Sequence, residues 1–185
     1  GFIKKINKIN YNKKNQMILF ESRNRLLYSH EFKVDQGAIN SKLYFDKIGA
    51  FLSLIKKKKI YNNFFIKNNS KNFGWNERDF FYKKNKKINF LNPKLKTFDL
   101  INKAKILIYS FPSTGHLECI SANANAPMLM FYFNDLSLMN NETKYFFKKF
   151  IKFGILHTKP ETLYKKLEQI YDDPYSWWSS NEIQS

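Results

Sequence analysis

Short runs of hydrophobic residues alternate along this chain with longer segments in which hydrophobic residues recur at helical spacing. Short apolar runs bounded by polar residues are typical of strands, and the longer periodic segments are typical of amphipathic helices. The alternation of the two indicates βαβ units and a parallel sheet. The runs at 106–110 and 128–133 are almost wholly apolar, as strands covered on both faces must be. We therefore expect a Rossmann-like three-layer α/β/α fold with a parallel sheet.

The strands that this pattern predicts are residues 17–21, 64–67, 88–91, 106–110 and 128–133. The predicted helices are residues 41–57, 77–84, 97–103, 115–123, 142–153, 160–171 and 174–184. In the segment 142–153 the apolar residues Tyr145, Phe146, Phe150 and Phe153 share one helical stripe, which we expect to face the sheet.

The segment 105–132 combines a strand, a tight turn, a helix and a second strand, close to the ~30 residues of a βαβ unit. Ligands of open α/β sheets bind beyond the carboxyl end of such strands. Pro112, Ser113, Thr114 and Gly115 supply small hydroxyl groups, close backbone access and N–H groups at a helix start, which together suit a diphosphate. Glu118 follows one turn into the helix, where a carboxylate can accept hydrogen bonds from a ribose diol.

Spacing alone leaves other interpretations of these residues open. Ser113 or Thr114 can serve only as a helix N-cap, and Glu118 only as a first-turn acid that the helix dipole favours. His116 is a candidate general base, but a lone His beside a helix start is more often a surface residue or a hydrogen-bonding support. Cys119 is expected to be buried and inert.

Several familiar catalytic and metal motifs are absent from the sequence. It has no Gly-x-Gly-x-x-Gly, no Walker-type phosphate loop, no nucleophile elbow and no His-Glu-x-x-His. Its histidines stand only at positions 30, 116 and 157, so we predict no zinc site. For Asp172 and Asp173 a cation site is one interpretation, and a helix-ending turn before Pro174 is the commoner one.

Composition favours one folded domain. The chain has 185 residues, of which 43% are hydrophobic and 18% aromatic, enough for one buried core. Residues 1–15 are polar and rich in Lys, Asn and Ile, and we interpret them as a linker or a remnant of a missing N-terminal domain, with residues 16–185 as the folded domain. A single cysteine excludes an internal disulfide and suits a reducing cytoplasm.

The net charge of +17 raises the alternative of nucleic-acid binding. The charge is nearly all Lys, it is spread along the chain, and it accompanies abundant Asn, Ile, Phe and Tyr, the set that AT-rich codons favour. We therefore expect no specific nucleic-acid partner. Each Lys near an anionic membrane contributes roughly 1 kcal/mol, and no apolar run is long enough to span a bilayer. Peripheral contact with the inner face of the membrane is the remaining expectation.

An ordered set of motifs between about residues 64 and 184 resembles the C-terminal region of a family of bacterial transferases found in O-antigen and other surface-carbohydrate gene clusters. The motifs are Phe73-Gly74-Trp75; Ser113-Thr114-x-x-Leu117-Glu118; Asn125-Ala126-Pro127 before the apolar run 128–133; Phe153-Gly154-Ile155-Leu156-His157; Tyr171-Asp172-Asp173; and Trp177-Trp178. The Gly-His pair after the strand is also similar to the sugar-acid transferases of lipopolysaccharide cores.

This resemblance implies a GT-B glycosyltransferase, in which two Rossmann-like domains face a cleft and the C-terminal one holds a nucleotide-sugar donor. It implies that Ser113 and Thr114 contact the donor phosphates and Glu118 the ribose. The acceptor would be a saccharide or a lipid-linked saccharide, and no cofactor is implied beyond the donor itself. The sequence departs from the family pattern at Lys67, where Arg is expected, and at Gly115-His116, which leaves the donor's identity open.

Three further residues are candidate donor ligands. Arg23 and Arg25 follow the first predicted strand, in a loop that faces the cleft of a GT-B domain, and guanidinium groups suit bidentate phosphate binding. A solvated loop is the equally weighted alternative. Trp75 can stack on a base or sugar, whereas Trp177 and Trp178 are expected to pack the last helix against the sheet or the missing domain.

The leading hypothesis is therefore glycosyl transfer from a nucleotide sugar to a growing bacterial surface polysaccharide or lipopolysaccharide. The donor-binding half alone would lack part of the active site. A GT-B-like nucleotide-sugar epimerase is an enzymatic alternative. A basic module that binds nucleic acid or an anionic membrane is the non-enzymatic one.

Overall fold

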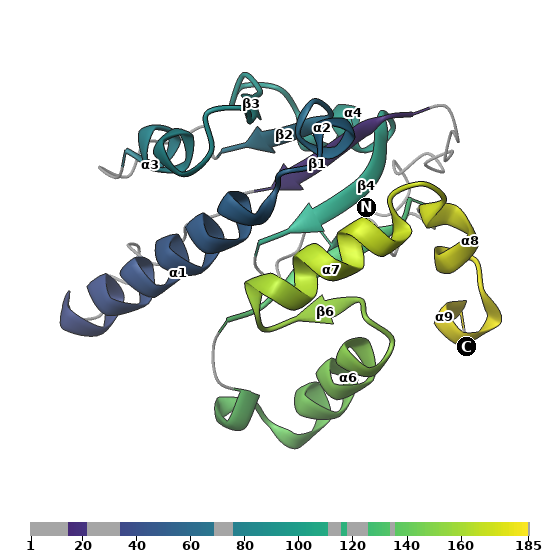
Figure 1. The fold of residues 1–185 in the computed structure, drawn as a ribbon. Helices are drawn as coiled ribbons and strands as arrows, with labels where there is room; N and C mark the ends of the chain where they lie inside the picture. Colours follow the sequence, from purple (N-terminus) through teal and green to yellow (C-terminus); the bar gives the residue numbers. More distant parts are fainter. Residues whose placement is uncertain are drawn as a thin grey trace.

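The structure, a computed structural model, describes residues 15–21, 34–68, 76–110, 116–117, 126–133 and 136–184. Figure 1 shows a twisted sheet with helices on both of its faces. All of its strand pairs are parallel. The predicted three-layer, Rossmann-like α/β/α fold is thereby confirmed.

The sheet has six strands in the order β3-β2-β1-β4-β5-β6. Their bounds are Met17–Glu21 for β1, Phe64–Lys67 for β2, Asn89–Phe90 for β3, Ala104–Tyr109 for β4, Met128–Phe131 for β5 and Leu156–His157 for β6. The predicted bounds of β1 and β2 are confirmed. The hydrophobic pattern did not predict β6, because two residues are too short to form a recognisable apolar run.

One face of the sheet packs against α1 (Val34–Leu54), α3 (Glu77–Lys84) and α7 (Pro160–Ile170), with the short α2 (Lys58–Tyr61) beside them. Side chains alternate across strands, so Ile106 and Ile108 of β4 point to this face. Phe20, Phe51 and Phe64 form an aromatic cluster there, with ring centroids 5.8–6.0 Å apart. This core fastens α1 to the middle of the sheet.

The other face carries α4 (Thr97–Ile101), α6 (Asn141–Lys152), α8 (Pro174–Trp178) and α9 (Asn181–Gln184). Leu107 and Met128 belong to its buried core. Trp177 and Trp178 pack against that core from α8, as expected of the last aromatic residues. A short 3-10 helix, η2 (Leu136–Leu138), precedes α6.

Tertiary contacts shift the ends of two predicted helices. The helix predicted for residues 41–57 begins earlier and ends at Leu54, and α2 follows it. The Asn85 side chain donates to the carbonyls of Leu52 (2.9 Å) and Ile55 (3.1 Å), so it occupies acceptors at the helix C-terminus. The predicted helix 174–184 is two helices, α8 and α9, because the chain turns at Ser179 and Ser180. In the predicted helix 115–123 the structure describes His116 and Leu117, and both are helical.

The predicted inner stripe of α6 is partly wrong. Phe150 and Phe153 do pack against the core, but Tyr145 and Phe146 are 57% and 56% exposed. Phe147 lies inside instead, with its ring edge against Tyr132 at 5.5 Å between centroids. A run of aromatic residues fits more than one helical stripe, and this contact with the segment after β5 selects the one that faces the sheet.

Residues 1–14 lie outside the described residues, so the predicted boundary between a linker and the domain stays a prediction. The side chain of Asn15 donates to the carbonyl of Asn102 (2.9 Å), beside the start of β4. In the part of the chain that the structure describes, no helix is long and apolar enough to cross a membrane.

Candidate active site at the carboxyl edge of the sheet

The strand order reverses at β1. From β1 the chain moves outward to β2 and β3, then returns to the other side of β1 with β4 and continues to β5 and β6. In open α/β sheets with such a reversal, ligands bind at the carboxyl edge beside the strands where the order reverses. Glu21 is in register with Lys67 of β2 and Tyr109 of β4, so three central strands end at the same level.

The connection after β4 is held firmly where it begins. Ser110 follows β4, is fully buried, and has its hydroxyl oxygen 2.7 Å from the hydroxyl of Tyr44 on α1. Tyr44 is itself buried and packs edge-on against Phe133, which follows β5. Helix α1 thus fixes the last backbone position before residues 111–115.

The far end of the same connection is also anchored. His116 is helical and 8% exposed. Its ring lies edge-on to Tyr109, the last residue of β4, with 6.3 Å between centroids. Of the interpretations offered for His116, this geometry favours a buried support. In the sequence, residues 111–115 are therefore bracketed by two buried residues: Ser110, which contacts Tyr44 of α1, and His116, which contacts Tyr109 of β4.

The connection after β2 brings a carboxyl group to the same edge. The Asn68 side chain, directly after β2, donates to Glu77, the first residue of α3, at 2.9 Å. Burial raises the pKa of Glu77, and the hydrogen bond from Asn68 acts in the opposite direction. Lys67, the last residue of β2, directly precedes Asn68 and is buried. A half-buried carboxyl with a raised pKa at the carboxyl edge of a parallel sheet is a candidate functional group.

A family model described as LIC12162 family transferase matches residues 2–185 of the chain. The chain belongs to this family of transferases. No curated protein and no solved structure matches it. Membership of this family supports an enzymatic role of the transferase class.

The seven residues predicted to bind the donor all lie outside the described residues of the transferase. They belong to three connections, and these leave β1, β2 and β4, whose carboxyl ends are adjacent. They are Arg23 and Arg25 after β1, Trp75 after β2, and Ser113, Thr114, Gly115 and Glu118 after β4. Their roles stay predictions, as does the expectation for Cys119.

Two residues at this edge, Tyr44 and Glu77, were not predicted from the sequence. Tyr44 sits in the middle of a long helix, and only the fold brings it to Ser110, 66 residues away. Glu77 was assigned to a helix without a role. Glu77 is the first residue of the helix that follows β2, and in a parallel sheet this position lies at the carboxyl edge. That position is the sequence signal that could have identified it.

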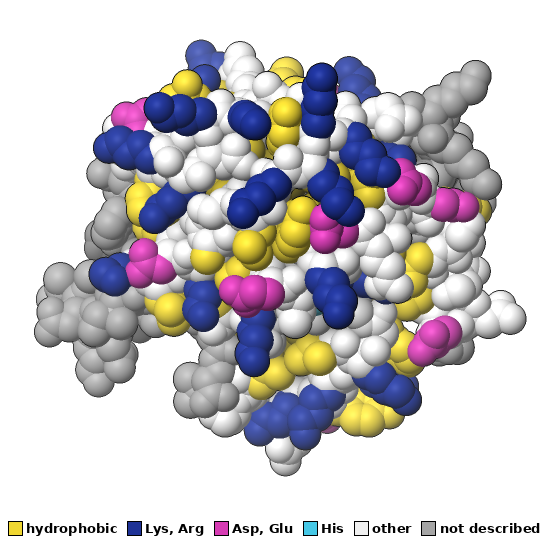
Figure 2. Space-filling model, viewed as in Figure 1, with side chains coloured by type: hydrophobic (Ala, Val, Ile, Leu, Met, Phe, Trp, Pro, Cys, Tyr) yellow, Lys and Arg dark blue, Asp and Glu magenta, His cyan; other side chains and the backbone are white. Residues whose placement is uncertain are grey.

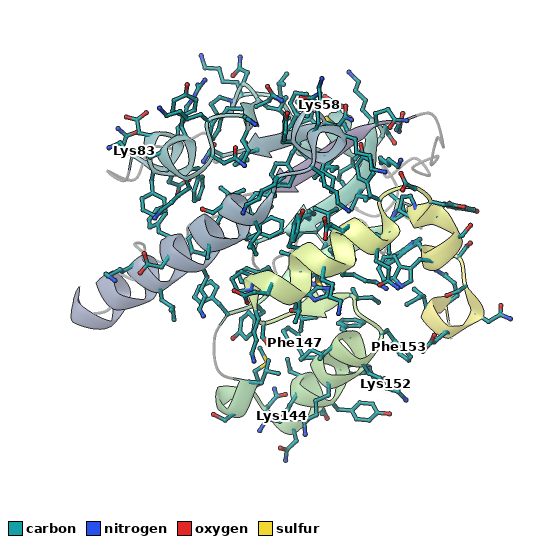
Figure 3. The ribbon with its side chains drawn as sticks, in the orientation of Figure 1. Lys58, Lys83, Lys144, Phe147, Lys152 and Phe153 are labelled. Atoms are coloured by element: carbon teal, nitrogen blue, oxygen red, sulfur yellow. The ribbon has the colours of Figure 1, made fainter. Side chains whose placement is uncertain are left out.

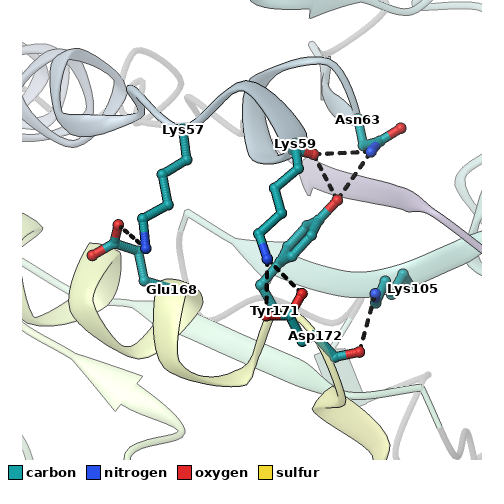
Figure 4. Close-up of polar contacts among 7 residues, drawn as sticks. All are labelled: Lys57, Lys59, Asn63, Lys105, Glu168, Tyr171 and Asp172. Atoms are coloured by element: carbon teal, nitrogen blue, oxygen red, sulfur yellow. Dashed lines mark hydrogen bonds and ion pairs between the residues drawn. The ribbon is translucent and has the colours of Figure 1, made fainter.

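The opposite edge of the sheet holds a polar cluster with a structural role (Figure 4). Lys59 donates to both carboxylate oxygens of Asp172 (2.6 and 2.8 Å), which lowers the pKa of that carboxyl. The Tyr171 hydroxyl donates to the Lys59 carbonyl (2.6 Å) and accepts from Asn63 (2.9 Å). Lys105 lies over the Tyr171 ring, 4.6 Å from its centroid, and burial lowers its pKa. The cluster ties the end of α7 to α2 and β4.

The adjacent acids form a helix-ending turn. Asp173 accepts from the backbone N–H of Ser176 (3.1 Å) and so caps α8, while Asp172 pairs with Lys59. Within the described ranges, no group of three His, Cys, Asp or Glu side chains is arranged to hold a metal ion.

Proposed function

We propose that the transferase moves a sugar from a nucleotide-sugar donor to a saccharide acceptor, and that the donor binds at the carboxyl edge beside β1 and β4. The observation that carries this proposal is the bracketed connection after β4. Ser110 and His116 are both buried, and Tyr44 and Tyr109 hold them at the point where the strand order reverses. Between them stand the hydroxyl and glycine residues 113–115.

In this proposal Ser113, Thr114 and the backbone at Gly115 bind the donor diphosphate, and Glu118 binds the ribose hydroxyls. The bond between the anomeric carbon and the diphosphate breaks, and an acceptor oxygen forms the new bond to that carbon. The acceptor's proton leaves to a base, which we do not assign to this chain. Preorganised donors that face the departing diphosphate stabilise its developing charge, which is the main catalytic contribution expected of such a site.

The resemblance to surface-carbohydrate transferases supports the finer assignments. These are a GT-B arrangement with a second domain that supplies the acceptor side, and an acceptor that is a bacterial polysaccharide or lipid-linked saccharide. Arg23, Arg25 and Trp75 are assigned to phosphate and base or sugar contacts, because their connections leave β1, which pairs with β4, and β2, which pairs with β1.

The proposal is tested with Glu118→Ala in the complete protein, after a thermal-shift panel of UDP, GDP, CDP, CMP and dTDP has identified the donor nucleotide. A ligand at 100 times its Kd adds about 2.7 kcal/mol of stability, which is easily seen. Loss of a charged hydrogen bond to ribose costs roughly 1.5–3 kcal/mol, so we expect a fall of about 10- to 150-fold in donor affinity or transfer.

Glu161→Ala is the matched control. Glu161 is an exposed first-turn acid of α7, so its removal costs only the dipole contribution of about 0.3–1 kcal/mol in stability. Transfer by this control variant should equal wild type. Unchanged transfer by Glu118→Ala would contradict the ribose assignment. Conversion of the donor to its epimer without an acceptor would contradict glycosyl transfer itself.

A further inference from the structure

The outer face of α6 exposes two large aromatic side chains. Tyr145 and Phe146 are each more than half exposed, although the neighbouring Phe147 and Phe150 pack against the core. The two exposed rings contact each other edge to face, with 5.7 Å between centroids. Exposed aromatic pairs on a helix that already buries an apolar side are unusual for a surface that meets only water.

Lysine surrounds these rings. Four lysines accompany a single acid, Glu142, in this helix: Lys144, Lys148, Lys149 and Lys152. The Lys149 ammonium lies 5.1 Å from the centroid of the Tyr145 ring. Figure 3 shows Phe147 on the side of α6 that faces the sheet, with Lys144 and Lys152 away from it. In Figure 2, Lys and hydrophobic side chains lie together at the lower end of the molecule, over α6.

We propose that this outer face of α6 binds an anionic phospholipid surface. Tyr and Phe rings bury favourably at the level of the headgroups, and the long lysine side chains extend beside them to the lipid phosphates. Each lysine near such a surface contributes roughly 1 kcal/mol, or about fivefold in binding. The face of a single helix is convex and fits a flat surface, whereas single-stranded nucleic acid is bound in grooves that follow its backbone.

The start of α6 lies on the same side of the sheet as the candidate site. Helix α6 follows β5, so its first turn starts on the side of the sheet where the strands end. In this proposal, docking through α6 brings that end of the sheet near the membrane, and the link to a lipid-linked acceptor rests on the proposed function. Vesicle binding requires no transfer, so the inference is tested independently of the proposed function.

The test is flotation of the protein, at about 0.15 M salt, with vesicles of phosphatidylcholine alone and of phosphatidylcholine mixed with phosphatidylglycerol. We expect binding to the mixed vesicles only. The triple variant Lys148→Gln/Lys149→Gln/Lys152→Gln should lose about a hundredfold in binding. The variant Tyr145→Ser/Phe146→Ser keeps every charge and should lose on the order of tenfold, because it removes the apolar contribution.

Lys83→Gln/Lys84→Gln/Lys86→Gln is the matched control, since it removes the same charge from exposed positions in and after α3. Its loss should stay below about threefold, because salt screens charges that are not at the contact. All changed positions are exposed or partly exposed, and unchanged melting curves verify folding. Equal losses in the α6 and control lysine variants, or unchanged binding by the aromatic variant, would overturn the proposal. Binding of RNA but not of vesicles, sensitive to the same α6 residues, would overturn it too.

Discussion

His157 illustrates how one buried side chain makes the stability of this transferase depend on pH. Its Nε2–H donates to the carbonyl of Gly154 (3.0 Å), and Gly154 has the positive φ of 68° that favours glycine. Burial lowers the pKa of His157 from its usual 6.5 to about 4, and nearby Lys166 acts in the same direction. The folded protein therefore holds a neutral imidazole, whereas the unfolded chain protonates it below pH 6.5.

This difference in protonation does not reduce the free energy of unfolding above pH 6.5. The free energy of unfolding then falls as the pH drops from 6.5 toward 4, because protons bind the unfolded chain and not the folded protein. We expect about 2 kcal/mol of this loss at pH 5. The measurement is urea unfolding of wild type and His157→Gln at pH 7 and pH 5, because Gln keeps an N–H donor for the Gly154 carbonyl. Wild type should lose about 2 kcal/mol more than the variant. An equal loss in both proteins would mean that His157 is not the titrating group.

At the same scale, the hydrogen bond between Tyr44 and Ser110 stabilises the start of the connection after β4. Tyr44→Phe removes the 2.7 Å hydrogen bond between the two hydroxyls and should cost about 1 kcal/mol of unfolding free energy. A double-mutant cycle with Ser110→Ala isolates the coupling of the pair. Tyr82→Phe, at an exposed position of α3, is the control and should change nothing measurable. A coupling energy near zero would argue against the contact.

Among the elements, α6 allows a test of which aromatic residues of a helix face the core. Phe150 packs against the core while Phe146 is exposed, four positions earlier on the same helix. Phe150→Ala should therefore destabilise the protein by roughly 2–3 kcal/mol, less than a fully buried Phe because it is only partly buried. Phe146→Ala should change stability by less than about 0.5 kcal/mol. Chemical unfolding of both variants at pH 7 gives the comparison, and the reverse ranking would contradict the observed register.

At the scale of the whole molecule, one sheet is shared by two buried clusters, one on each face. Adjacent residues of β4 belong to opposite clusters, so neither can come apart without disturbing the other. We therefore expect a single cooperative unfolding transition. Far-UV circular dichroism and tryptophan fluorescence should give the same midpoint in urea. Two separated transitions would show that residues 16–185 are not one folding unit.

The many lysines do not gather in one part of the visible surface. Figure 2 shows Lys and Arg distributed over the visible face, with acids between them, rather than gathered in one stripe. The α6 surface differs from this background because aromatic rings are exposed among its lysines.

Local pattern was sufficient for the class of the fold and for several element bounds. β1, β2 and α3 match their predicted residues because each is a short segment whose polar and apolar positions already specify strand or helix. The connection after β4 was also singled out from sequence, since hydroxyl residues and a glycine between a strand and a helix are a local pattern, and its donor-binding role stays a prediction.

Only the tertiary structure decided the rest, because it depends on residues far apart in the chain. The strand order, the two-residue β6 and the end of α1 at Leu54, where Asn85 donates to the carbonyl of Leu52, depend on packing partners that no local window contains. The inner face of α6 was decided by Phe147 meeting Tyr132, among aromatic residues that fit more than one stripe. Likewise, the hydroxyl of Tyr44 reaches Ser110 only because α1 packs across the sheet. Periodicity specifies what each segment is, and long-range burial determines where its side chains meet.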